Sequence, residues 1–222
     1  MYLLSKSALF SILNIAQLFI LLPLITIVFR YKRFNTTFKL IALLLVSAGV
    51  FALIGNILHR QAINNMVISH LYTIVEYICW SLVYIRLFDT KVVKKLVISS
   101  IFLVITFSIV NIFLWQPLDV YNSYSKTVES AFLLCFAIGW FYKIFVDQSI
   151  RRLEIHPVFW INSAVLIYFS GAFLLFVTNN FLLEIPLIEY FEAWALHGIF
   201  IMIHYLFISI GLWLLKHKKE LR

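Results

Sequence analysis

A chain of 222 residues in which 63% are hydrophobic and only 13% are charged is too apolar for a water-soluble domain, where about a quarter of the residues carry charge. This composition excludes a soluble fold. The net charge of +8 does not indicate a nucleic-acid partner, because the basic residues fall between long apolar stretches, as they do in membrane proteins.

Seven apolar stretches follow one another along the chain. Each approaches or exceeds the 20 or so residues that a helix needs to cross a bilayer. The stretches are continuously apolar rather than alternating, which favours helices over a barrel. We predict an all-α, polytopic membrane protein in a single domain, with no soluble domain and with transmembrane helices at 7–29, 38–58, 67–88, 96–115, 127–147, 158–177 and 194–216.

The four prolines agree with these boundaries. Pro117, Pro157 and Pro186 fall in predicted connections, where a missing N–H breaks no helical hydrogen bond, and Pro23 should kink the first helix. The longest connection, 178–193, is apolar and carries three glutamates. This pattern suggests an amphipathic lid lying in the membrane interface.

Basic residues cluster after every second predicted helix. The clusters after helices 1, 3, 5 and 7 are Arg30, Lys32, Arg33 and Lys39; Arg86, Lys91, Lys94 and Lys95; Lys143, Arg151 and Arg152; and Lys216, Lys218, Lys219 and Arg222. They hold 15 of the 18 basic residues and leave Lys6, Arg60 and Lys126 on the other side. The positive-inside rule therefore predicts an external N-terminus and a cytoplasmic C-terminus.

A faint internal similarity relates the first three helices to the last three. Residues 47–56 (SAGVFALIGN) resemble 170–179 (SGAFLLFVTN), and His70 corresponds to His197. This similarity predicts a 3+1+3 parallel repeat with the fourth helix as connector. Small sugar carriers and vitamin-uptake carriers share that plan, but their Pro-Gln motif is missing here.

Few ionisable side chains lie inside the predicted helices, and each calls for an explanation because a charge at the bilayer centre costs about 2.5 kcal/mol or more. On the predicted topology they lie at the midplane or in the outer half. We predict an outward-facing ligand pocket between helices 3, 5, 6 and 7, lined by His70, Tyr72, Glu76, Glu129, Trp194, His197 and His204. The alternative is that each group only hydrogen-bonds a neighbouring helix. Glu129, near the start of its helix, suits the helix dipole without any further role.

The histidines do not have the spacing of a metal site. His197 and His204 are seven residues apart, so they share a helix face but lie about 10.5 Å apart along the axis, too far to bind one zinc ion together. The HExxH pattern of zinc hydrolases is absent, and so is the lysine in the last helix that a retinal protein requires. We expect no metal and no cofactor, and an enzyme is less favoured than a binding protein.

Three stretches resemble a group of uncharacterised bacterial seven-helix integral membrane proteins. They are 69–80 (SHLYTIVEYICW), 159–176 (FWINSAVLIYFSGAFLLF) and 192–207 (EAWALHGIFIMIHYLF). The resemblance covers most of helices 3, 6 and 7 and implies a multi-pass protein of the bacterial inner membrane. It implies no activity and no role for any residue.

Three functions stay open. The first is a receptor-like, ligand-sensing or accessory membrane subunit, in which a small external or lipid-borne molecule enters the pocket and the basic inner face signals to a cytoplasmic or membrane protein partner. The second is a small-solute transporter, because Glu76 near the midplane could couple transport to protons. The third is a membrane-embedded enzyme. Membrane lipid is the one partner common to all three.

Overall fold

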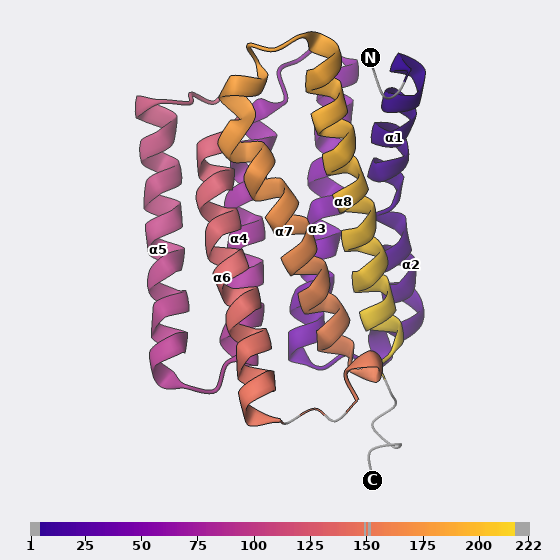
Figure 1. Cartoon of the computed structure of the whole chain (residues 1–222), viewed down its shortest axis with the longest axis vertical. Coiled ribbons are helices and arrows are strands. Elements are labelled where there is room, and N and C mark those ends of the chain that lie inside the picture. The colour runs from indigo at the N-terminus through magenta and orange to yellow at the C-terminus, as the bar shows by residue number, and fades with distance from the viewer. Residues whose placement is uncertain (1–4, 149, 151, 216–222) are drawn as a thin grey trace. The chain divides into compact units, whose positions relative to one another are not determined.

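The computed structural model describes residues 5–148, 150 and 152–215, and these residues form helices joined by short connections, with no strand among them (Figure 1). The elements are α1 (Lys6–Leu18), α2 (Leu21–Arg30), the 3-10 turn η1 (Tyr31–Arg33), α3 (Thr36–Arg60), α4 (Met66–Leu87), α5 (Lys91–Leu114), α6 (Ser123–Asp147), the 3-10 turn η2 (Leu153–Ile155), α7 (Pro157–Leu182) and α8 (Leu187–Trp213).

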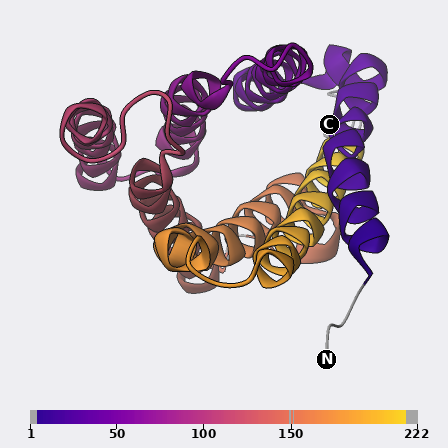
Figure 2. The same ribbon diagram turned by 90° about the horizontal axis from the view of Figure 1, so that it is seen from above.

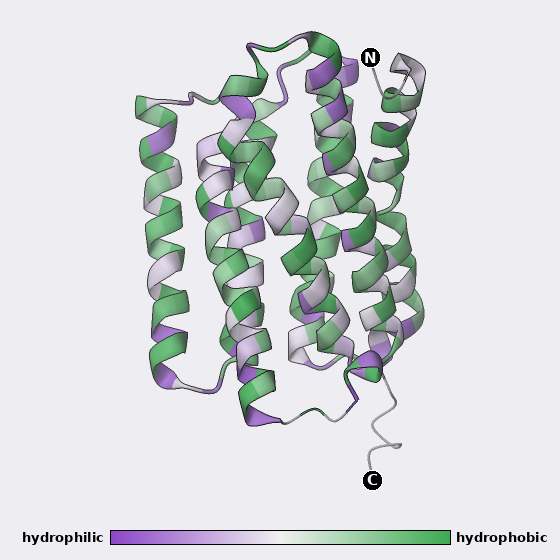
Figure 3. Cartoon of the chain, in the orientation of Figure 1, coloured by the Kyte–Doolittle hydropathy of each residue, from purple (hydrophilic) through white to green (hydrophobic). Residues whose placement is uncertain are grey.

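Seven of these helical segments are long and apolar enough to cross a membrane, which confirms the predicted class of fold. The first segment combines α1, α2 and η1, and α3 to α8 supply the other six. Apolar residues dominate the middle of the helices in Figure 3. Some of the largest exposed side chains are aromatic, with Phe145 82% exposed and Phe113 81% exposed. A surface of this kind is suited to lipid rather than water.

The first span is interrupted close to Pro23, as predicted. α1 ends at Leu18 and α2 begins at Leu21. Pro23 has no N–H to donate to the carbonyl of Phe19 four residues earlier, and that carbonyl accepts instead from the N–H of Leu22 at 3.0 Å. The break therefore lies one turn before the proline.

The connection 178–193 differs from the prediction. α7 continues to Leu182 and α8 begins at Leu187, so that only 183–186 lie outside a helix. Pro186 is the N-cap residue immediately before α8, where its missing N–H is tolerated. The glutamates that suggested an interfacial lid therefore extend the last span or stand in a tight turn.

The chain divides into two compact units. One contains α1, α2, α7, α8 and the part of α6 that begins at Ala137. In it, α8 packs between α7 on one side and α1 with α2 on the other (Figure 2). The ring of Phe10 lies 5.1 Å from that of Phe191, and the Arg30 guanidinium lies 4.2 Å above the ring of Trp213. The first and last spans therefore run in the same direction, and Arg30 at the end of α2 lies beside the end of α8.

The other unit, Phe34–Phe136, contains α3, α4, α5 and the first half of α6. Asn35 caps α3 by accepting from the N–H of Phe38 at 3.2 Å. α4 packs against α3 and against α5, and Figure 2 shows it between them. Its buried face carries Tyr84, whose ring lies 5.5 Å from that of Phe136 on α6. This unit holds the buried charges described below.

The two units do not coincide with the halves of the predicted repeat. The first span lies in one unit with the sixth and seventh, while the second, third and fourth spans lie in the other. The repeat and the orientation in the membrane stay predictions. Of the basic clusters behind that orientation, Arg151 and Lys216, Lys218, Lys219 and Arg222 lie outside the described residues.

Candidate functional site

Three of the predicted site residues lie on α4, which turns them toward the interior of its unit. His70 and Glu76 are buried, at 3% and 6% exposure. The hydroxyl of Tyr72 donates to Oε1 of Glu76 at 3.1 Å, as expected for residues one turn apart. The ring nitrogen Nε2 of His70 lies 3.0 Å from the carbonyl oxygen of Val120. Glu76 is thus held in one orientation near the middle of its helix.

The start of α6 adds two further charged side chains to this cluster. Lys126 and Glu129 are buried, and Glu129 is only 1% exposed. The ammonium group of Lys126 lies 5.7 Å from the centre of the Tyr72 ring. Both Glu76 and Glu129 interact electrostatically with Lys126, and Glu129 also interacts with Glu76. We call Tyr72, Glu76, Lys126 and Glu129 the charged cluster.

The charged cluster contains more acid than base. With every group ionised, the two carboxylates and one ammonium would carry a net charge of −1, and within the described part of the chain Lys126 is the one cation that acts on Glu76 and Glu129. Oε1 of Glu129 is buried without a hydrogen-bond partner among the described residues. An uncompensated buried charge costs about several kcal/mol, so this arrangement favours uptake of a proton or of a small cation.

An amide beside the cluster joins α4 to the start of α6. The hydroxyl of Ser69 donates to Oδ1 of Asn122 at 2.7 Å, and Nδ2 of Asn122 donates to the hydroxyl of Thr73 at 2.8 Å. All of the bonding groups come from polar side chains in an apolar protein, where an unpaired group is expensive. This bridge fixes the distance between the helices that carry Glu76 and Lys126.

A second network joins α5 to α6. Nδ2 of Asn111 lies 3.1 Å from Oε1 of Gln116 and 3.2 Å from the hydroxyl of Ser125, and Nε2 of Gln116 donates to the hydroxyl of Ser123 at 2.8 Å. Asn111 therefore bonds a neighbouring helix through Ser125. The first turn of α6 is consequently anchored on two sides, which positions Lys126 and Glu129.

The remaining predicted residues lie on α8, in the other unit. Nδ1 of His204 lies 3.1 Å from the carbonyl oxygen of Ala164 on α7, and His204 is buried. The ring of Tyr168 lies 4.7 Å from that of His204 and 5.5 Å from that of His197. Trp194 contacts His197 edge-on at 5.6 Å. The two histidines thus share one face, as their spacing predicts, and pack there against α7.

The seven predicted residues are divided between the two compact units. His70, Tyr72, Glu76 and Glu129 belong to one unit, and Trp194, His197 and His204 to the other. Among the described residues, no three His, Cys, Asp or Glu side chains are placed to hold a metal ion together. The charged cluster is the group with evident chemistry, because the α8 histidines already contact a carbonyl and aromatic rings.

The sequence analysis missed Lys126 and misjudged the position of Glu129. It began the fifth helix at residue 127, whereas α6 begins at Ser123. Lys126 is therefore helical, and Glu129 lies near the end of the second turn, beyond the reach of a simple dipole effect. The spacing of three between Lys126 and Glu129, which places both on one helix face, was the signal that could have found the pair.

Comparison of the chain with protein-family models, with curated proteins and with solved structures finds no match. The described residues show a multi-pass helical membrane protein with a buried charged cluster between its third and fifth spans.

Proposed function

We propose that the chain is a small-ligand-binding subunit of the bacterial inner membrane, and that Glu76, Lys126 and Glu129 form its binding centre. The observation that supports this most strongly is the surplus carboxylate, because Glu129 is buried with an unpartnered oxygen beside a second acid. Buried ionisable groups in membrane helices are costly and usually mark a binding site or an ion pathway.

The charge balance suggests the ligand class. A small organic amine would add the missing positive charge and supply N–H donors to the free oxygen of Glu129. Tyr72 would keep Glu76 oriented through its 3.1 Å hydrogen bond, and Lys126 would prevent two carboxylates from facing each other unscreened. Ligand binding would then change how the spans pack, and a protein partner would detect that change.

Ligand binding is tested with purified protein in nanodiscs and a panel of primary amines, quaternary amines and carboxylates. Some amines should raise the melting temperature of the wild type, and Glu129→Gln should lose that response while still folding. Glu184→Gln is the matched control, because Glu184 is exposed in the turn before α8. A panel that stabilises wild type and Glu129→Gln equally would exclude this binding centre.

The alternative function is a proton-coupled transporter for a small solute, and the same surplus acid favours it. One proton bound by the carboxylate pair would neutralise the cluster, and its release on one side of the membrane could drive movement of a solute. The internal pH of proteoliposomes loaded with a pH-sensitive dye should change when an amine gradient is imposed, and Glu76→Gln should abolish the signal. A ligand-sensing subunit should move neither protons nor amine.

A further inference from the structure

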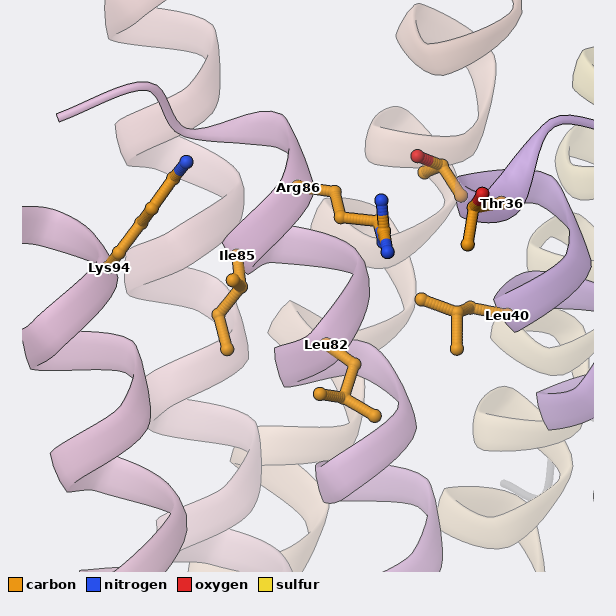
Figure 4. A pocket seen from close by; sticks show the side chains of 7 residues that line it. Thr36, Leu40, Leu82, Ile85, Arg86 and Lys94 are labelled. Atoms are coloured by element: carbon orange, nitrogen blue, oxygen red, sulfur yellow. The ribbon is translucent and has the colours of Figure 1, made fainter. Parts of the chain in front are cut away.

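An open groove lies along α4 at the opposite end from His70. It has a volume of about 630 Å³ and is lined by Thr36, Thr37 and Leu40 of α3, Leu82, Ile85 and Arg86 of α4, and Lys94 of α5 (Figure 4). All of these residues belong to one compact unit. The charged cluster uses none of them.

The groove is basic at the membrane surface and apolar below it. In Figure 4 the guanidinium group of Arg86 extends toward Thr36, and Lys94 lies on the other side of Ile85. The lining contains two cations, two threonine hydroxyls and no acid. Three branched apolar side chains complete it: Leu40, Leu82 and Ile85.

The position of the cations matters as much as their charge. Arg86 lies in the last turn of α4, and Lys94 lies in the first turn of α5, so both stand where a membrane span meets the headgroups. Leu82, one turn deeper on α4, is exposed. An occupant therefore meets positive charge at the surface and an apolar wall on the bilayer side.

We propose that this groove binds an anionic phospholipid, with the phosphate beside Arg86 and Thr36, on the groove that Lys94 also lines, and an acyl chain along Leu82 and Leu40 (Figure 4). Arg86 can donate two parallel hydrogen bonds to phosphate oxygens, and Lys94 adds a point charge. Thr36 and Thr37 supply hydroxyl donors to the headgroup. Basic pockets between membrane helices commonly hold anionic headgroups, and the apolar wall favours a lipid over a soluble anion.

Native mass spectrometry of the detergent-purified chain measures this binding, with phosphatidylglycerol and phosphatidylcholine as the two lipids. The wild type should retain phosphatidylglycerol in preference to phosphatidylcholine. The double variant Arg86→Gln, Lys94→Gln should bind phosphatidylglycerol about thirtyfold more weakly, as expected when two cations near a headgroup are lost. The matched control is Lys91→Gln, Lys95→Gln, which removes two exposed charges from the same end of α5 and should keep the preference.

A third variant tests the groove without altering its charge. Leu40→Trp places a large ring in the lining and should also weaken phosphatidylglycerol binding. Equal losses in both double variants would overturn the proposal in favour of diffuse attraction to the surface. The proposal would also fail if Leu40→Trp and the double variant Arg86→Gln, Lys94→Gln both bound phosphatidylglycerol as the wild type does. Equal retention of the two lipids by the wild type would overturn it as well. Full competition by glycerol 3-phosphate would overturn it in favour of a soluble phosphate ester.

Discussion

Lys126 and Glu129 lie three residues apart on α6, but they should respond to substitution in opposite ways. Lys126→Met removes the cation that acts on both buried carboxylates, and loss of one member of a buried ion pair costs about 3–5 kcal/mol. Glu129→Gln removes the surplus charge instead and should leave the free energy of unfolding unchanged or slightly higher. Chemical unfolding in detergent measures both. Equal destabilisation by the two variants would mean that Glu129 is a structural partner and carries no surplus charge.

His156 allows a prediction about pH. It is the N-cap residue of α7, its ring lies 6.3 Å from that of Trp140, and burial lowers its pKa from the ordinary value of 6.5. The folded protein then binds this proton less tightly than the unfolded chain, so stability is lost as the pH falls below 6.5.

The melting temperature of the wild type should therefore fall more than that of His156→Gln when the pH is lowered from about 7.5 to about 5.5. His59→Gln is the control, since His59 lies exposed near the end of α3. Parallel pH profiles for the wild type and His156→Gln would show that the ring contributes nothing to the dependence.

At the scale of the helices, Gly211 sets how closely α8 approaches α7. A Cβ atom at Gly211 would lie 2.6 Å from Cγ1 of Ile161 and 2.7 Å from the carbonyl oxygen of Pro157, so the two helices would have to separate. Gly211→Ala should destabilise the protein by about 1–3 kcal/mol, the usual cost of overpacking. Thermal unfolding in detergent measures the effect.

Gly55 on α3 is the matched control for this substitution. A Cβ atom there would meet its nearest neighbours at 3.8 and 3.9 Å, which is ordinary contact. Gly55→Ala should therefore be neutral or stabilising by up to about 1 kcal/mol, because alanine favours a helix over glycine. If the two variants behave alike, the approach of α8 to α7 at Gly211 is looser than the structure shows.

The existence of the spans was predictable from the sequence, and their ends were not. Length and continuous apolarity are local properties, so seven segments could be counted without any knowledge of packing. The start of α8 at Leu187 and of α6 at Ser123 depends on polar residues that hydropathy alone assigns to loops. Glu189 and Lys126 are helical because α8 and α6 each begin before the predicted apolar stretch. Lys126 is also buried within its unit.

The candidate site was predictable only in part, for the same reason. Glu76 was identifiable as costly from its position alone, and the spacing of Tyr72 placed the two on one helix face. The interaction of Glu76 with Lys126 depends on how α4 packs against α6, and local sequence does not encode that packing. The bridge through Asn122 between the same helices was missed for that reason too.

At the scale of the whole molecule, the placement of the basic residues predicts the orientation in the membrane. Within one unit, Nη1 of Arg33 donates to the carbonyl oxygen of Leu215 at 3.1 Å, so the ends of the first and last spans lie together. Within the other, Arg86 and Lys94 line one groove. Each unit thus brings several cations together at one end, and the positive-inside rule predicts that these ends face the cytoplasm.

Reporter fusions test this orientation. Alkaline phosphatase should be active when inserted in 61–65 or 115–122, and green fluorescent protein should fluoresce when inserted in 88–90 or after Arg222, because the first reporter folds outside the cytoplasm and the second inside it. Replacing Arg30, Lys32 and Arg33 by glutamine removes the charge bias next to the first span and should give mixed orientation, whereas replacing Arg60 should not. A fluorescence signal from 61–65 combined with phosphatase activity after Arg222 would show that the orientation is the opposite of the predicted one. The anionic lipid in the groove beside Arg86 would then belong to the outer leaflet.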